Sequence, residues 1–368
     1  MHPPKDARIL VAMSGGVDSA VTAALLAEAG YDCYGVTMRL VPEHPGKSVF
    51  EPCCGIEATQ DARRVCERLG IPHETVHAVD RFSRDIIAHF TAEYAAGRTP
   101  NPCVRCNRMI KFGALYQHAD KLGADYIAMG HYARLVTYEG RVALRRAAYR
   151  PKDQSYVLAP LTQPQLRRAC FPLGDLTKDN VRTHAQKLDF RTANKPESQE
   201  ICFVPDNNYR SFLDQHLGTP RPGPIMTLAG EVVGEHTGLT HYTPGQRKGL
   251  GLSADRPYYV VRLDTARNTV LVAHAEATPC TAFDTSRLCW GGLARQEEPF
   301  ECLVQLRSHH TPVPATVSPI RAGARVALHT PQRAITPGQW AVMYDTGGHV
   351  LASAPVRDFT LAHEESRF

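Results

Sequence analysis

The sequence of 368 residues has no long hydrophobic run, no internal repeat and no low-complexity tract. A membrane-spanning helix requires roughly 18 consecutive apolar residues, and no segment approaches that length. A signal peptide is not expected either, because the polar stretch 1–8 is followed by an apolar run that is only long enough for a strand. We therefore expect a cytoplasmic protein without a membrane segment.

The chain also lacks a strong excess of one charge. Its net charge is +5, with 21% charged and 43% hydrophobic residues, so it can bury an ordinary globular core. This balance permits contact with nucleic acid but does not establish it. The 11 cysteines are an odd number at irregular spacings. Such spacing argues against a disulfide framework and favours reduced thiols with some chemical use.

Two common phosphate-binding motifs are absent: the kinase-type P-loop, because no lysine follows the glycine pair at 15–16, and the G-x-G-x-x-G dinucleotide fingerprint. Instead, the apolar run 9–13 leads into Ser14-Gly15-Gly16-Val17-Asp18-Ser19 and then into a helical pattern. A strand that enters a glycine pair and a helix points unpaired backbone N–H groups at one place, where an anion can bind. The two serine hydroxyls can add hydrogen bonds, and the Asp18 carboxylate can help to hold Mg²⁺. This segment predicts a phosphate-binding loop.

Up to about residue 130, short apolar strands alternate with helical patterns, which predicts an α/β fold whose parallel sheet is covered by helices on both faces. We expect strands at 8–13, 33–40, 73–79 and 126–129, and helices at 57–69, 81–96 and 111–122. Ligands of such sheets bind at the carboxyl ends of the strands. Ser14, Met38 and Gly130 lie at such ends, so we predict one nucleotide pocket there.

The remainder of the chain changes character. We predict a hairpin at 138–149 and helices at 163–169 and 177–188, followed by a stretch rich in glycine and proline at 218–224. The segments 302–306, 325–329 and 339–344 alternate apolar and polar residues, as in a small β-barrel. The predicted domains are an α/β domain at 1–206, a small linker domain at 207–280 and a C-terminal β-barrel at 281–368.

Two segments carry cysteines in informative surroundings. The first, 97–107, holds Cys103 and Cys106, and its glycine and two prolines predict a loop in which Arg105 favours the reactive thiolate form. The second, 198–203, holds Cys202 in a predicted short apolar strand, where a thiol is by itself more often a core residue. The adjacent Cys53 and Cys54 fall in a predicted loop, and we assign them no role.

The phosphate loop and the cysteine segments together closely resemble the bacterial tRNA-specific 2-thiouridylases, the MnmA family of the ATP pyrophosphatases. The resemblance covers essentially the whole chain and is carried by SGGVDS, GRTPNPCVRCNRMIKFG, ADYIAMGHYAR, KDQSYVL, ICF, GQRKGLGL and TPGQ. It implies an adenine-nucleotide α-hydrolase-like PP-loop domain, a linker domain and a tRNA-contacting β-barrel. It also implies an enzyme that uses ATP to adenylate the C2 oxygen of wobble uridine 34 in tRNA, and that replaces this oxygen with sulfur delivered as a persulfide by a carrier protein.

The resemblance also implies roles for single residues. Cys202 would carry the persulfide, and Cys106 would be the nucleophile that activates the site or attacks the persulfide, leaving a Cys106–Cys202 disulfide. The ATP site would comprise Ala12, Met13, Ser14, Gly15, Gly16, Val17, Asp18, Ser19, Met38 and Gly130. The tRNA site would comprise Asn101, Pro102, Cys103, His131, Lys152, Asp153, Gln154, Arg307, Ser308 and Gln339. Salt-sensitive phosphate contacts are expected from Lys152, Arg247, Lys248 and Arg307.

One departure from the family leaves the sulfur chemistry open. Many relatives carry aspartate where this chain has Cys103, so Cys103, Cys106 and Cys202 could instead ligate a [4Fe–4S] cluster that binds the sulfide. Zinc fits less well, because a structural zinc site takes four ligands. Two other functions stay open: a PP-loop synthetase that acts on a small molecule, and an RNA-binding protein without catalytic activity.

Overall fold

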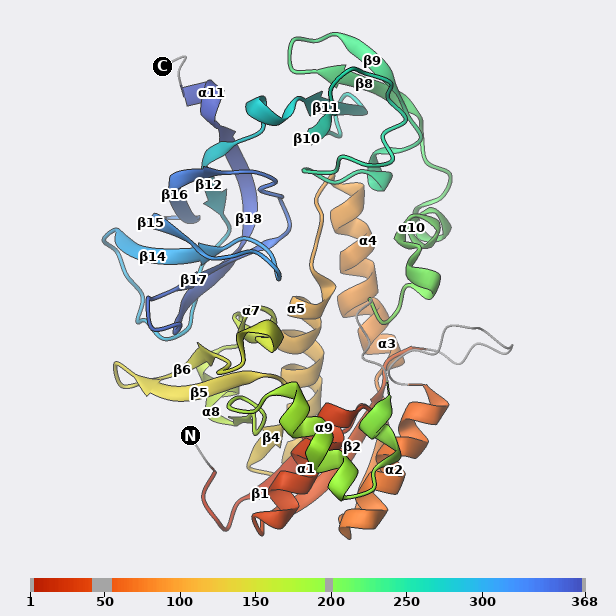
Figure 1. The fold of residues 1–368 in the computed structure, drawn as a ribbon, viewed down its shortest axis with the longest axis vertical. Helices are drawn as coiled ribbons and strands as arrows, with labels where there is room; N and C mark the ends of the chain where they lie inside the picture. Colours follow the sequence, from red (N-terminus) through yellow and green to blue (C-terminus); the bar gives the residue numbers. More distant parts are fainter. Residues whose placement is uncertain (1–2, 42–54, 196–200, 366–368) are drawn as a thin grey trace.

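The computed structural model describes residues 3–41, 55–195 and 201–365. Figure 1 shows three units: an α/β unit that contains the N-terminus, a small unit around strands β8 to β11, and a barrel that contains the last strand, β18. This architecture confirms the predicted fold class.

The α/β unit is built on a five-stranded sheet in the order β3-β2-β1-β4-β7, and all neighbouring strands are parallel. Four strands lie where the sequence predicts them, whereas the last one replaces the end of the helix predicted at 163–169. The strands are β1 (Arg8–Ala12), β2 (Asp32–Arg39), β3 (His73–His77), β4 (Tyr126–Ala128) and β7 (Ala169–Cys170).

Both faces of this sheet are covered. Ile9, Leu10 and Val11 of β1 are fully buried, although successive strand residues point to opposite faces. Ile9 and Val11 pack with α1 (Val17–Glu28), α2 (Ile56–Leu69) and α9 (Lys178–Lys187). Leu10 packs on the other side with the helical segment 102–121. The central position of β1 therefore places the loop that follows it in the middle of the sheet edge.

The other helical segments of this unit are short. They are α3 (Val79–Phe82), η1 (Ser83–Ile87), α4 (Ala88–Ala95), α5 (Pro102–Cys106), η2 (Asn107–Ala114), α6 (Leu115–Lys121), η3 (Arg150–Lys152), α7 (Ser155–Leu158), α8 (Gln163–Arg167) and η4 (Arg191–Asn194). The hairpin predicted at 138–149 lies at 133–146 and consists of β5 (Ala133–Tyr138) and β6 (Arg141–Arg146), so its first strand begins earlier than expected. Its turn residues Glu139 and Gly140 have φ angles of 46° and 74°, because a two-residue turn of this kind needs left-handed backbone.

Two further units follow η5 (Pro205–Asn207) and α10 (Tyr209–Leu217). The small unit has a four-stranded sheet, β10-β11-β8-β9, formed by β8 (Gly223–Thr227), β9 (Val232–His236), β10 (Tyr259–Asp264) and β11 (Thr269–Ala273), with the turns η6 (Leu239–His241) and η7 (Ala275–Ala277). The barrel unit contains β12 (Cys280–Thr285), β13 (Cys289–Trp290), β14 (Phe300–Gln305), β15 (Val313–Ile320), β16 (Gly323–Gln332), β17 (Trp340–Tyr344), β18 (Val350–Leu361) and α11 (Ala362–Glu365). Strand β12 pairs with both β16 and β18, and this double pairing closes the barrel.

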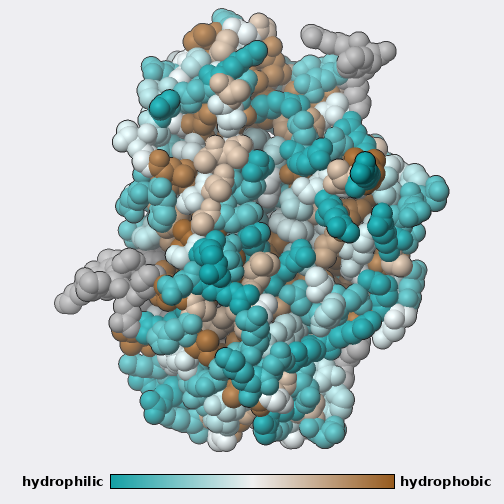
Figure 2. All heavy atoms as spheres, turned by 180° about the vertical axis from the view of Figure 1, so that it is seen from behind, coloured by the Kyte–Doolittle hydropathy of each residue, from teal (hydrophilic) through white to brown (hydrophobic). Residues whose placement is uncertain are grey.

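Hydrophobic residues on the face seen in Figure 2 are scattered among hydrophilic ones rather than gathered in one broad patch. Among the residues that the structure describes, no helix combines the length and the apolar character needed to cross a bilayer.

Candidate nucleotide and thiol site

The predicted phosphate loop connects β1 to α1 at the carboxyl end of the sheet. Gly15 has a φ of 72°, and a Cβ atom there would lie 2.2 Å from the Ala58 carbonyl oxygen, so only glycine fits. Ser19 Oγ accepts a hydrogen bond from the Ser14 backbone N–H at 3.2 Å and donates one to the Gly16 carbonyl at 3.0 Å. The loop is thereby folded against the first turn of a 12-residue helix, whose N-terminus favours an anion.

Asp18 makes contacts that the sequence did not reveal. The Lys178 ammonium donates to Asp18 Oδ1 at 2.7 Å, and the Tyr132 hydroxyl donates to the same oxygen at 2.8 Å. Lys178 is the first residue of α9, directly after the cap residue Thr177, and its side chain is only 10% exposed. A cation at a helix N-terminus is unfavourable for the helix, and this local conflict is the signal that could have singled out Lys178.

A cavity of about 220 Å³ lies beside this loop. Gly130 forms part of its wall, and a Cβ atom there would lie 2.8 Å from the Asp18 carbonyl carbon. Gly15, Gly16 and Val17 complete the loop without lining the cavity. The lining residues are Ala12, Met13, Ser14, Asp18, Ser19, Val36, Met38, Leu40, Lys111, Leu115, Met129, Gly130, His131 and Gln154.

His131 contributes a polar group to this cavity. Its Nδ1 atom is buried and has no hydrogen-bond partner among the described residues. Burial, together with the Lys111 ammonium, holds the pKa of His131 well below its ordinary value of 6.5, so the ring is neutral at pH 7. Lys111 belongs to the motif GRTPNPCVRCNRMIKFG but was not among the predicted site residues, and it brings a positive charge to the cavity.

The first cysteine segment is not the loop that its prolines suggested. Residues 102–106 form helix α5, with Pro102 in the first turn and the Asn101 side chain accepting a hydrogen bond from the Val104 N–H at 3.3 Å. Proline is tolerated at this position because the first N–H groups of a helix have no partner within the helix. An asparagine followed by proline is the signal that could have predicted this helix start.

Within α5, the two cysteines have different surroundings. Cys103 is an exposed residue, but packing around its thiol raises the pKa, partly opposed by Lys111. Cys106 is buried. Arg105 donates from Nε to the Asp85 carbonyl at 2.7 Å and is not among the groups that shift the pKa of Cys103. Arg105 therefore does not favour the thiolate of Cys103, and its effect on Cys106 stays a prediction.

Cys202 lies on a turn before η5, not in the predicted strand, because Val204 N–H bonds back to the Ile201 carbonyl. It packs against the hydrophobic cluster that also contains Cys106, and we call this group the thiol cluster. Its buried members are Leu40, Phe82, Ile86, Phe90, Tyr94, Cys106, Ile110, Phe203, Val204, Phe212 and Leu213, and Met38 and Cys202 pack at its edge. Both cysteines are free thiols.

The structure does not bring together the three cysteines that a [4Fe–4S] cluster would require. Among the described residues, which include Cys103, Cys106 and Cys202, no three cysteine, histidine or carboxylate side chains form a group that could hold a metal ion. Cys53, Cys54 and residues 198–200 of the second cysteine segment lie outside the described residues.

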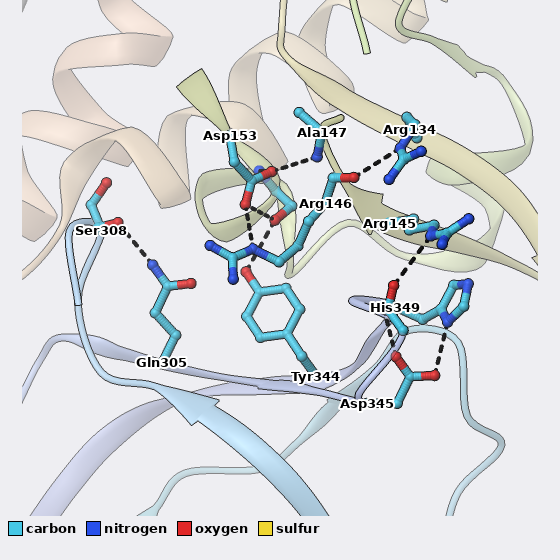
Figure 3. A network of polar contacts seen from close by, with 12 residues as sticks. Arg134, Arg145, Arg146, Ala147, Asp153, Gln305, Ser308, Tyr344, Asp345 and His349 are labelled. Carbon is cyan, nitrogen blue, oxygen red and sulfur yellow. Dashed lines mark hydrogen bonds and ion pairs between the residues drawn. The ribbon is translucent and has the colours of Figure 1, made fainter. Parts of the chain in front are cut away.

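Several residues of the predicted tRNA site have internal partners. The Asp153 carboxylate is 4% exposed and accepts hydrogen bonds from Arg146 Nε at 2.7 Å and from Ser155 Oγ at 3.0 Å. Figure 3 shows this carboxylate beside Arg146, facing Tyr344 of the barrel. The Ser308 carbonyl accepts a hydrogen bond from Gln305 Nε2 at 2.8 Å. Gln154 Oε1 accepts from the Tyr132 N–H at 3.0 Å. Lys152 ends η3, and the Arg307 side chain is exposed.

Gln339 joins the barrel to the segment that precedes α5. Its Nε2 donates to the Thr99 carbonyl at 2.9 Å, while the Thr99 N–H donates to the Pro337 carbonyl at 2.8 Å. The Thr99 hydroxyl donates to Thr243 Oγ1 of the small unit at 3.2 Å. We call these contacts the Thr99 clasp. They show that part of the predicted tRNA site is a junction between units of the protein itself.

Family models match three consecutive parts of the chain. The tRNA methyl transferase HUP domain matches residues 7–206, the tRNA methyl transferase PRC-barrel domain matches residues 210–274, and the aminomethyltransferase β-barrel domain matches residues 280–356. A solved structure titled as a 4-thiouridine synthetase–RNA complex with bound ATP aligns with 57% of this chain and 50% of its own, at 14% identity and a TM-score of 0.35.

Curated relatives match almost the entire chain. The tRNA-specific 2-thiouridylase MnmA of Heliobacterium modesticaldum is 44% identical over 98% of this chain and 95% of the relative. The protein of the same name from Carboxydothermus hydrogenoformans is 48% identical over 95% of this chain and 97% of the relative. With this identity over nearly the full length of both partners, the chain belongs to the MnmA family of tRNA-specific 2-thiouridylases.

Proposed function

We propose that this protein is an ATP-dependent tRNA 2-thiouridylase that acts on the wobble uridine, position 34. In the first step the uridine O2 attacks the α-phosphorus of ATP, the bond to the α,β-bridging oxygen breaks, and pyrophosphate leaves. In the second step sulfur adds to C2 and AMP is expelled with the original oxygen. The observation that carries the proposal is that Met38 and Leu40 belong both to the cavity beside the phosphate loop and to the thiol cluster.

The first step needs a site for phosphates and a way to offset their charge. The backbone N–H groups of the loop and the start of α1 supply the anion site. Asp18 and the Ser14 and Ser19 hydroxyls are hard oxygen donors, which suit Mg²⁺. We propose that Asp18 holds Mg²⁺, which neutralises phosphate charge when bound, and that Met38 and Gly130 contact the adenosine part of ATP.

For the second step we propose that Cys202 receives a persulfide from a carrier protein. The terminal sulfur attacks C2 of the adenylated uridine, and the Cys106 thiolate then attacks Cys202 Sγ. The electron pair of the broken S–S bond passes to the transferred sulfur, a Cys106–Cys202 disulfide forms, and a thiol reductant returns two electrons to restore both thiols. Membership of both cysteines in the thiol cluster supports this route over the iron–sulfur alternative, whose ligands the described residues do not gather.

The rest of the chain is proposed to bind tRNA in the cytoplasm. The proposal keeps the domain division at 1–206, 207–280 and 281–368 and the predicted tRNA contacts of Asn101, His131 and Arg307. We propose that the target uridine leaves the anticodon stack to reach the cavity between Asn101 and the phosphate loop. A synthetase of small molecules is less well supported, because it would leave the barrel and the small unit without a use.

The test is a reconstituted reaction with ATP, Mg²⁺, a persulfide donor and unmodified tRNA, in which pyrophosphate release and 2-thiouridine are measured. Cys106→Ser should abolish thiouridine and keep ATP binding. The matched control is Cys289→Ser, because the Cys289 thiol donates to the Pro160 carbonyl and a hydroxyl can make the same hydrogen bond. Absence of thiouridine with every donor would refute the proposal. Iron and acid-labile sulfide in anaerobically purified protein would instead show that the second step uses an iron–sulfur cluster rather than a persulfide.

A further inference from the structure

A second cavity, of about 210 Å³, lies between the small unit and the barrel. It shares no lining residue with the nucleotide cavity. Its walls are largely apolar and include Val260 of β10 and Leu361 at the end of β18. Its polar side chains are mainly the guanidinium groups of Arg307 and Arg333 and the hydroxyl of Tyr259. The cavity is therefore an apolar hollow with a positively charged rim.

Arg333 is held in place at this rim. Its Nε donates to Thr278 Oγ1 at 2.8 Å, and its guanidinium carbon lies 4.4 Å from the centre of the Tyr259 ring. Arg247 belongs to the small unit, and the guanidinium groups of Arg333 and Arg247 both favour the ionised form of Tyr259 and lower its pKa. The two guanidinium groups thus act on the same hydroxyl, one from each unit.

No carboxylate balances these charges. The lining of the cavity contains no aspartate or glutamate, and within the described residues Arg247, Arg307 and Arg333 form no ion pair. Nearby arginines behave differently: Arg256 pairs with Glu276, and Arg262 pairs with Asp358 at 3.1 Å. Arginines that converge without an acidic partner form a site for an anion with several oxygen acceptors, of which phosphate is the usual one.

We propose that Arg247, Arg307 and Arg333 form a seat for a backbone phosphodiester of tRNA. This inference rests on the proposed function. The sequence predicted separate phosphate contacts from Arg247 and Arg307, and the structure adds Arg333 and the cavity between the small unit and the barrel. The apolar walls can pack against the C–H groups of the ribose that a phosphodiester carries. A bare inorganic ion has no apolar part that could use them. The segment 333–339 connects the seat to the Thr99 clasp, because it begins at Arg333 and ends at Gln339. RNA bound in the seat is thereby held beside the segment that leads into α5.

The test is the salt dependence of tRNA binding, measured by fluorescence anisotropy between 50 and 250 mM salt. Each phosphate contact that is lost lowers the slope of log K against log salt concentration by about one. We expect this decrease for Arg333→Gln and for Arg247→Gln, with weaker binding throughout the range. Arg256→Gln removes the same charge from a side chain that has its own carboxylate partner and should keep the wild-type slope.

Two controls make the result decisive. Arg333→Gln retains an amide for Thr278, and Arg247 is an exposed residue, so melting temperatures should show that both variants fold. If both variants keep the wild-type slope, the seat is wrong while the proposed function stands. If inorganic phosphate binds through Arg333 and the tRNA slope is unchanged, the site takes a free anion and the seat is again wrong. If the wild-type protein shows no salt-dependent tRNA binding, the proposed function itself fails.

Discussion

Gln339 of the barrel bonds the carbonyl of Thr99 in the α/β unit at 2.9 Å, across a separation of 240 residues. Thr99 lies two residues before Asn101, whose side chain caps helix α5. The barrel and the small unit therefore fix the chain that enters the helix of Cys103 and Cys106. This contact gives the C-terminal unit a structural effect on the thiol site that does not require RNA.

Removal of the clasp should reduce turnover more than nucleotide binding. For Gln339→Ala we expect thiolation to fall several-fold and stability to fall by about 1 kcal/mol, the typical value of one hydrogen bond. The affinity for ATP should not change, because Gln339 does not line the nucleotide cavity. Thiouridine formation and ATP binding are the two measurements. Gln296→Ala is the matched control, since that side chain donates to the nearby carbonyl of Ala294, and a similar loss in both variants would contradict the role of the clasp.

The two donors to Asp18 should contribute unequally to ATP binding. Lys178→Met removes a positive charge beside the phosphate loop and leaves the Asp18 carboxylate uncompensated, so we expect the KM for ATP to rise about tenfold or more, as for a charge-assisted hydrogen bond. Tyr132→Phe removes a neutral donor, worth about 1 kcal/mol, and should raise the KM by about fivefold at most. Steady-state pyrophosphate release measures both variants. Equal effects would show that the charge of Lys178 is not what matters.

Glycine substitutions should separate backbone strain from steric exclusion. Gly15 and Gly30 both have positive φ angles, 72° and 79°, but a Cβ atom meets Ala58 at the first position and open space at the second. We expect Gly30→Ala to cost about 1 kcal/mol, as strain alone requires. Gly15→Ala should cost clearly more and should also displace the phosphate loop. Urea unfolding and ATP binding are measured for both variants. Similar stability of the two would argue against the close contact between position 15 and Ala58.

Thiol labelling at pH 8 should depend on burial. Burial raises the pKa of Cys33 to about 11 and those of Cys66 and Cys170 to about 12, so these thiols stay protonated and inert. Among the described cysteines, Cys103 is exposed and Cys202 is partly exposed, so both should react with iodoacetamide before the buried thiols. Peptide mass spectrometry after timed quenching gives the order. Labelling of Cys66 as fast as Cys202 would contradict the described packing.

Stability should decrease below pH 6.5. Burial lowers the pKa of His73, His89, His131 and His310 from 6.5, so between 6.5 and the lowered pKa the unfolded chain binds protons that the folded chain does not. The free energy of unfolding then falls as the pH falls. His131→Gln should remove up to about 1.4 kcal/mol per pH unit of this dependence. Urea denaturation at pH 7.5, 6.5 and 5.5 is the measurement, and an unchanged slope in the variant would contradict the burial of His131.

The sequence predicted those parts of the fold that depend on local pattern. Buried parallel strands such as β1 are continuous apolar runs, and the glycine loop after it has a fixed relation to strand and helix, so both could be located. Helix α5 was missed because Pro102 was interpreted as a loop residue rather than as the first residue of a helix. The strand predicted around Cys202 is a turn, since an apolar run of that length does not by itself determine strand or helix.

Contacts between distant segments could not be predicted. Nothing near Lys178 in the sequence indicates that its ammonium reaches Asp18, and nothing near Asp153 indicates that its carboxylate is buried against Arg146. The family resemblance grouped Gln339 and Asp153 with residues that bind tRNA, whereas in the structure both bond to the protein.

The position of Thr99 also matters for how the protein is made. The ribosome adds Gln339 240 residues after Thr99, and at synthesis rates of roughly 5–20 residues per second this interval is about 10–50 seconds. During that interval the carbonyl and N–H of Thr99 are satisfied by water. In a newly made N-terminal unit, the segment that leads to the thiols therefore lacks its contact with the barrel until Gln339 has been added.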